Sequence, residues 1–236
     1  MKTASLYALF LALPTAWGAS LTHDYDLTNS LNDLIGSASL ISDGGTISAA
    51  GYAFGANQGL NVSSALTDTG NYSLLIDFNF QDLSGYRKIL DFKNLASDNG
   101  VYNLSTDLNY FNFAFGPTGA FTANTLAQVI ITRDSATNLV TGYVDGTSEF
   151  SFTDSSSDAV FSGTNGIIRF LEDDNVTGER ESSGGLATHI SIYDGALTAA
   201  EVAALNAVPE PTSVLLLGTG LAALGFAAKR RQAANA

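Results

Sequence analysis

The clearest hydrophobic pattern in the chain is an alternation over residues 71–81. Apolar side chains occupy every second position, at Tyr72, Leu74, Ile76, Phe78 and Phe80. The positions between them are mostly polar. A period of two is typical of an antiparallel strand with one face in a core, so this segment predicts a half-buried strand.

Shorter apolar segments of the same kind follow, and turn residues separate them. They span 89–92, 111–115, 126–132, 139–144, 149–152, 167–171 and 188–193. In the second of these, Phe111, Phe113 and Phe115 are expected to share one face. Asp145-Gly146 predicts a two-residue hairpin. Residues 23–59 have a weaker pattern, which predicts loops, short strands and one helical turn near residues 30–34.

Residues 197–205 form the exception to this β pattern. Thr198 followed by Glu201 is a capping box, and the alanines between 199 and 204 favour a helix. At least seven short strands with regular turns and one closing helix indicate an all-β protein. The expected architecture is an antiparallel β-sandwich that occupies residues 21–207.

The first 20 residues have the order of a secretory signal peptide. A lone Lys2 precedes an apolar run over residues 6–13, and Pro14 and small residues follow. Residues 16–18 and 18–20 both satisfy the small-x-small rule, so cleavage is expected between residues 18 and 21. The alternative is a buried N-terminal helix.

The C-terminal 29 residues have the order of a membrane sorting signal. A rigid motif, Val208-Pro209-Glu210-Pro211, precedes an apolar run over residues 212–228 and the basic cluster Lys229-Arg230-Arg231. About 17 helical residues span roughly 25 Å, near the thickness of a bilayer core. A transmembrane helix over 212–228 is therefore expected, and the basic cluster would remain cytoplasmic.

The segment between these two ends is strongly acidic and contains no cysteine. The ends hold one of the 23 acidic and four of the ten basic residues, which leaves 22 against 6 and a net charge of −16. Such a charge argues against nucleic acid as a partner and is compatible with divalent cations as counter-ions. The lack of cysteine excludes disulfides, thiolate zinc sites and thiol nucleophiles.

Two parts of the domain resemble laminin-G-like domains of the concanavalin A superfamily. Residues 189–205 are similar to the last strand and closing helix of that family, and Tyr143-Val144-Asp145-Gly146 to one of its hairpins. Residues 71–80 resemble its early core strand. The resemblance implies a jelly roll of two antiparallel sheets, a fold that hosts lectins, adhesion modules, glycosidases and spacers.

The tail resembles the PEP-CTERM sorting signal of Gram-negative bacteria that make exopolysaccharide. The motif, the spanning segment and the basic stop are all present in the expected order. The resemblance implies processing near the motif by an exosortase, a membrane enzyme, after transient anchoring in the inner membrane. A lipid-anchor signal is the rival, but such a tail ends apolar. Gly218-x-Gly220 lies inside this apolar run and is not a dinucleotide fingerprint.

The acidic loop after the predicted strand 167–171 is a candidate calcium site. It carries carboxylates at Glu172, Asp173, Asp174, Glu179 and Glu181, with Asn175 among them. Calcium prefers such oxygen ligands and tolerates irregular geometry. The alternative is a solvated acidic loop. As a glycosidase pair, Glu172 and Asp174 are disfavoured because they follow the strand and enter the loop.

Candidate glycan-binding residues are tyrosines with neighbouring amides. One group comprises Tyr102, Asn103, Asn109 and Tyr110, and a second comprises Tyr52, Phe54 and Asn57. Core packing is the competing explanation for these aromatic residues. His189, on the same strand face as Tyr193, is expected to be a satisfied surface histidine, and neither it nor His23 is accompanied by a nucleophile motif.

The sequence therefore predicts a secreted or cell-surface protein without catalytic residues. We expect it to bind extracellular polysaccharide or to associate with the surrounding matrix. One alternative is a structural surface protein that contacts other proteins and has no glycan affinity. Another is a divergent glycoside hydrolase with two carboxylates in a groove.

Overall fold

The structure is a computed structural model that describes residues 18–163 and 165–206. The chain divides into two compact units, residues 1–203 and 204–236. The predicted signal peptide up to residue 17, the sorting motif and the predicted transmembrane segment lie outside the described residues. Within the described ranges, no helix is long and apolar enough to cross a membrane.

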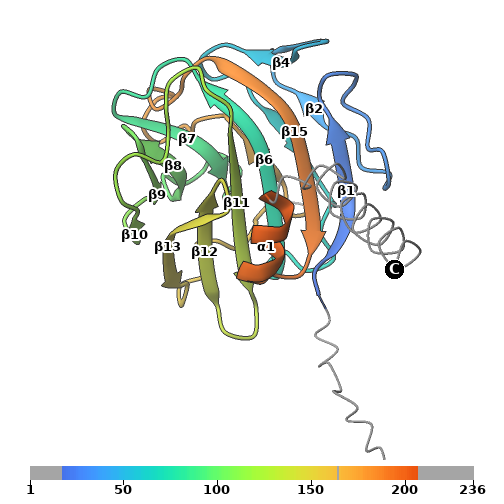
Figure 1. Ribbon diagram of the computed structural model, residues 1–236, viewed down its shortest axis with the longest axis vertical. Coiled ribbons are helices and arrows are strands. Elements are labelled where there is room, and N and C mark those ends of the chain that lie inside the picture. The colour runs from blue at the N-terminus through green and yellow to red at the C-terminus, as the bar shows by residue number, and fades with distance from the viewer. Residues whose placement is uncertain (1–17, 164, 207–236) are drawn as a thin grey trace, which may run out of the picture. The chain divides into compact units, whose positions relative to one another are not determined.

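Two antiparallel sheets form a sandwich (Figure 1). The first sheet has the order β13-β12-β11-β6-β15-β4-β3, and β1 also pairs with β15. Its strands are β1 (Ser20–Asp26), β3 (Thr46–Ser48), β4 (Gly51–Phe54), β6 (Tyr72–Phe80), β11 (Ala127–Asp134), β12 (Leu139–Val144), β13 (Thr147–Thr153) and β15 (Gly185–Asp194).

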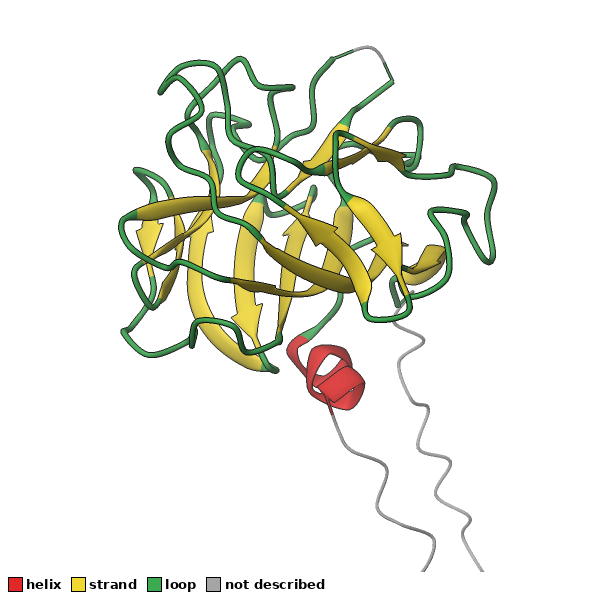
Figure 2. Cartoon of the chain, turned by 90° about the horizontal axis from the view of Figure 1, so that it is seen from above, coloured by secondary structure: helices red, strands yellow, loops and turns green. Residues whose placement is uncertain are grey.

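The second sheet has the order β10-β9-β8-β7-β14-β5-β2. Its strands are β2 (Ile41–Ser42), β5 (Leu60–Val62), β7 (Tyr86–Asp91), β8 (Gly100–Leu104), β9 (Asp107–Tyr110), β10 (Ala114–Phe115) and β14 (Ile168–Phe170). The two sheets lie as layers in the view from above (Figure 2). The predicted antiparallel β-sandwich is confirmed.

The main core lies between the sheets and includes one face of β6. All five apolar residues of the sequence alternation belong to it, at Tyr72, Leu74, Ile76, Phe78 and Phe80. Neighbouring strands match this parity, because Ile131 of β11 and Ile192 of β15 both lie opposite Leu74. The period of two therefore identified the buried face of the central strand.

Local turn chemistry sets the predicted hairpin between β12 and β13. Asp145 and Gly146 both have positive φ, 47° and 78°. This is the backbone of a type I′ turn, which favours Asp-Gly and matches the twist of the two strands. The hairpin is confirmed.

Residues 20–26 form the strand β1, and residues 23–59 contain short strands as expected. Two other sequence expectations need correction. Residues 30–34 contain bends but no helical turn. Residues 111–115 are not one strand, because the chain turns at Asn112, which has a φ of 66°, between β9 and β10. Phe113 and Phe115 are consequently exposed.

The predicted closing helix is α1 (Ala199–Asn206). Its capping box is present, since the Thr198 amide donates to Glu201 Oε2 at 2.7 Å and the Glu201 amide donates to Thr198 Oγ1 at 3.3 Å. Val202 is fully buried in a second apolar cluster, which we call the outer cluster. Its other buried members are Leu75, Ile130, Tyr143, Tyr193 and Leu197.

The outer cluster explains why β6 carries an apolar residue, Leu75, on the face that a half-buried strand would turn to solvent. Leu75 faces away from the core, opposite Ile130 of β11 and Ser191 of β15. This face of the first sheet is buried where α1 and its lead-in pack. The candidate site lies at the edge of this covered area and shares Tyr143 and Leu197 with the outer cluster.

Truncating a core side chain of β15 tests the inward face. Ile190→Ala removes a fully buried side chain that packs between the sheets. We expect a loss of about 2–5 kcal/mol in the free energy of unfolding, measured by denaturant titration. The matched control is Leu186→Ala on the outer face of the same strand, which should cost less. An equal loss for both variants would contradict the assignment of faces.

Candidate binding site

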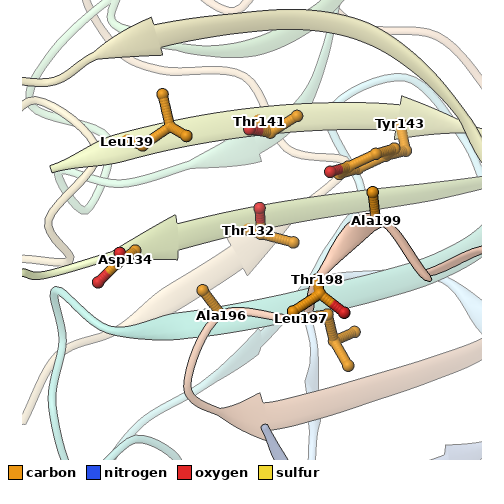
Figure 3. A pocket seen from close by; sticks show the side chains of 9 residues that line it. All are labelled: Thr132, Asp134, Leu139, Thr141, Tyr143, Ala196, Leu197, Thr198 and Ala199. Atoms are coloured by element: carbon orange, nitrogen blue, oxygen red, sulfur yellow. The ribbon is translucent and has the colours of Figure 1, made fainter. Parts of the chain in front are cut away.

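A pocket of about 290 Å³ lies on the outer face of the first sheet, beside the start of α1 (Figure 3). One wall is formed by β11 and β12, and the other by the segment that leads from β15 into α1. The lining residues are Thr132, Asp134, Leu139, Thr141, Tyr143, Ala196, Leu197, Thr198 and Ala199.

Strand register places the first wall. Thr132 lies opposite Thr141, and Asp134 lies opposite Leu139, so all four side chains point to the same face. Each of these threonines alternates with residues that point into the main core, such as Ile131. The polar positions of the two strands therefore form a patch on the face that the core does not use.

Ser73 of β6 holds the second wall in place. Its hydroxyl accepts a hydrogen bond from the Leu197 amide at 2.7 Å and donates one to the Gly195 carbonyl at 2.9 Å. Leu197 is also buried in the outer cluster. The backbone between residues 195 and 198 is thus fixed to the sheet on both sides of Ala196.

The pocket combines three hydroxyl groups, one carboxylate and one aromatic ring. Among the described residues, the Thr132 hydroxyl makes no hydrogen bond to another protein group. Asp134 accepts hydrogen bonds at 2.8 Å from the Ala136 amide and the Thr137 hydroxyl, which hold its carboxylate in place. Burial raises the pKa of Tyr143, so its phenol is neutral. The pocket offers fixed polar groups to an uncharged, hydroxyl-rich ligand.

His189 lies on the same face of the sheet, between two carboxylates. Its Nε2 is 2.7 Å from Asp24 Oδ1 of β1, and its Nδ1 is 3.5 Å from Asp77 Oδ2 of β6. The contact with Asp77 raises the pKa of His189; burial opposes this, and Asp24 adds to the increase. The histidine therefore links three neighbouring strands, and its two carboxylate partners favour its charged form, in agreement with the expected satisfied surface histidine.

Ser191 stands near His189 but lacks the arrangement of a nucleophile. Its hydroxyl is 3.3 Å from His189 Nε2, yet it donates to Asp24 Oδ1 at 2.8 Å. The same carboxylate oxygen also receives the imidazole. The hydroxyl proton of Ser191 is directed at Asp24 and not at His189. The histidine therefore cannot act as the base that activates this serine, and the three residues do not form a catalytic triad.

The predicted calcium loop is held by protein cations instead of forming a metal site. Asp174 is fully buried and bonds to Lys88 Nζ, while Glu172 bonds to Arg169 Nη1 at 2.8 Å. Asp173 Oδ2 accepts from the Glu181 amide at 2.8 Å. Across the described ranges, no group of three or more acidic or histidine side chains is placed to hold a metal ion. Glu179 is exposed.

Lys88 takes the central place in this acidic cluster. It is fully buried, lies 3.6 Å from Asp91 Oδ2 and sits 4.9 Å above the Tyr102 ring. Burial works to raise the pKa of Asp174, but Lys88 outweighs it and lowers that pKa. Burial raises the pKa of Asp91, and burial with the nearby aspartates raises the pKa of Glu181 to about 7. The calcium expectation is therefore corrected: a lysine ammonium supplies the positive charge.

The glycan-binding residues expected from the sequence are inside the protein. Tyr102, Asn103 and Tyr110 are fully buried, and Asn109 is 1% exposed. The aromatic residues of the second group, Tyr52 and Phe54, are also buried, because they belong to the main core. A buried ring cannot stack on a sugar, so the competing explanation, core packing, is correct for these aromatic residues.

Residues 207–231 match the PEP-CTERM protein-sorting motif. The chain carries a PEP-CTERM sorting signal. The matched stretch contains Val208, Pro209, Glu210 and Pro211, and also Lys229, Arg230 and Arg231. The signal indicates exosortase-dependent export to the cell surface or extracellular space. None of the curated proteins compared with the chain matches its sequence.

Solved structures with a similar fold include carbohydrate-active proteins. Domain 4 of AbnA, a GH43 extracellular arabinanase from Geobacillus stearothermophilus, is 19% identical with a TM-score of 0.59, over 80% of this chain and 100% of that domain. Trypanosoma rangeli sialidase is 15% identical with a TM-score of 0.59, over 79% of this chain. The binding domain of botulinum neurotoxin serotype D is 14% identical with a TM-score of 0.57, also over 79%.

The chain spans 32% of the sialidase and 51% of the toxin binding domain. At these identities the likeness concerns the fold alone. It agrees with the antiparallel β-sandwich expected from the sequence. The pocket on the outer face was not predicted, because its two walls lie some 55 to 65 residues apart in sequence. The only local signal was outward-facing threonines within otherwise apolar strands.

Replacing His189 tests its charge in the folded state. Because the folded protein raises this pKa, the stabilisation is complete below the unfolded value of about 6.5 and is lost as pH rises through the folded pKa. Urea unfolding at about pH 6 and about pH 9 should show His189→Gln closer in stability to the unaltered chain at the higher pH. An equal difference at both pH values would contradict the interpretation.

Removing the buried lysine tests the acidic cluster. Lys88→Met leaves Asp91 and Asp174 without their cation, and we expect it to cost about 3–5 kcal/mol of unfolding free energy. The double variant Lys88→Met/Asp174→Asn removes one of the stranded charges and should recover part of that loss. Chemical denaturation of the three proteins gives the comparison. No recovery in the double variant would mean that packing alone explains the loss.

Proposed function

We propose that the exported sandwich is a non-catalytic glycan-binding module of the cell surface or extracellular matrix. The observation that carries the proposal is the composition of the pocket beside α1. It brings the hydroxyls of Thr132, Thr141 and Thr198 together with the Asp134 carboxylate and the Tyr143 ring. The hydroxyls and the carboxylate are groups that bind sugar hydroxyls, while the Tyr143 ring lines the pocket as a buried member of the outer cluster.

The size and rigidity of the pocket support a small saccharide unit as ligand. Its volume of about 290 Å³ is at the lower end of ligand pockets, which begin at roughly 300 Å³. A few placed polar groups within an apolar lining are typical of such sites. Leu139, Ala196 and Ala199 supply the apolar part here. One ring of a longer chain therefore fits, with the rest in solvent.

Related folds support the same ligand class. The arabinanase domain of similar fold was solved in complex with arabinotriose, and the sialidase with sialic acid. The export signal supports this ligand class, because a protein at the cell surface can meet extracellular polysaccharide. The strong negative charge of the domain favours neutral glycans over acidic ones, because like charges repel.

The pocket does not support glycoside hydrolysis. A glycosidase needs two carboxylates on either side of the bond that it cleaves. Asp134 is the one carboxylate among the lining residues. The pair considered from the sequence, Glu172 and Asp174, is bound to Arg169 and Lys88 and is buried. We therefore propose binding without turnover.

Removing pocket hydroxyls tests the proposal. A screen of the purified protein on neutral and acidic glycans identifies the probe, and titration calorimetry gives its affinity. Thr132→Val and Thr141→Val keep the side-chain shape and should each weaken binding roughly tenfold, the effect of one lost hydrogen bond. The matched control is Thr147→Val, an exposed threonine of β13 that lies outside the pocket.

Three outcomes would contradict the proposal. Absence of binding to every neutral glycan tested would overturn the glycan-binding function and favour a structural surface protein. Binding that is unchanged in Thr132→Val and Thr141→Val would place the site elsewhere on the domain. Release of reducing sugar ends during incubation would identify a hydrolase.

A further inference from the structure

Helix α1 is the last described element before the sorting motif in the sequence. It begins at Ala199, which lines the pocket, and ends at Asn206. Pro209 of the motif is three residues further along the chain, so only Ala207 and Val208 lie between. Any enzyme that cleaves near the motif meets a docked helix within a few residues of its site.

The docking of α1 rests on few contacts. Val202 is its one buried side chain among eight residues, and Ala203, Ala204 and Leu205 are exposed. The capping box at Thr198 and Glu201 stabilises the first turn. The segment before the helix is held much more firmly, through Ser73 and the burial of Leu197. A helix of this length has little stability of its own once it leaves the sheet.

Unwinding α1 would lengthen the connection to the motif considerably. Eight helical residues span about 12 Å, and the same residues fully extended span about 27 Å. The gain of about 15 Å is close to the radius of gyration of a domain of this size, roughly 16 Å. Unwinding would therefore add to the connection a length comparable to the size of the domain itself.

We propose that residues 199–206 form an additional part of the substrate segment of the exosortase-type enzyme. In the folded protein they pack as α1, and during processing they leave the outer cluster and are bound in extended form. Residues 195–198 remain fixed to the sheet, and the chain bends away after Thr198. The packing of Val202 in the outer cluster is the contact that is broken. The proposal depends on the sorting signal and is independent of glycan binding.

Processing rates of the full chain test the proposal. In cells that co-produce an exosortase-type enzyme, pulse-chase labelling measures the conversion of precursor to processed protein. Val202→Ala removes about two methyl groups from the outer cluster and should make α1 leave more often, which raises the rate roughly tenfold. The control, Ala203→Ser, changes an exposed position of the same helix and should be processed at the unaltered rate.

A second variant leaves the fold of the sandwich intact. Inserting eight Gly/Ser residues after Asn206 supplies the missing length while α1 stays docked. This variant should be processed faster than the unaltered chain, and adding Val202→Ala to it should give no further increase. Processing of the insertion variant at the unaltered rate would overturn the proposal, as would an unaltered rate for Val202→Ala. Neither result bears on the glycan affinity of the pocket.

Discussion

The antiparallel pairing of β6 with β15 supports most of the features described above. The two strands pair over nine residues of β6, and β15 continues on its other edge into pairing with both β4 and β1. Both faces of this pair are covered, by the main core on one side and by the outer cluster on the other. Because β15 runs directly into the pocket wall and α1, this pairing also positions the candidate site.

Charge in this protein is balanced by a few buried cations. Lys88 pairs with Asp174 and lies near Asp91 beneath an acidic loop, and Arg133 bonds to the buried Asp154 at 3.0 Å. Such pairs are costly to break because the remaining charge has no water around it. Glu172 and Asp173 are buried as well, and most of the other carboxylates are at least partly exposed, where their charge acts against anionic partners.

One short segment of the chain is part of both proposals, glycan binding and processing. Residues 196–199 line the pocket, and the helix that follows them ends next to the sorting signal. Under the two proposals, the segment before α1 is fixed where it lines the pocket, and α1 is weakly attached where the processing enzyme would bind extended chain. Rigidity comes from Ser73 and Leu197, and the weak attachment from the single buried side chain of α1, Val202.

The sequence by itself determined the fold class, the central strand, the Asp145-Gly146 hairpin, the capped helix and the sorting signal. Each depends on neighbours within a few residues, through periodicity, turn conformation or capping. Tertiary structure alone decided that Lys88 neutralises Asp174, 86 residues away, and that Tyr102 and Tyr110 are buried. It also decided that Thr132 and Thr198 share a pocket. These outcomes depend on which strands pair. Strand pairing brings together segments that are far apart in the sequence, and no local pattern in the sequence shows which segments will meet.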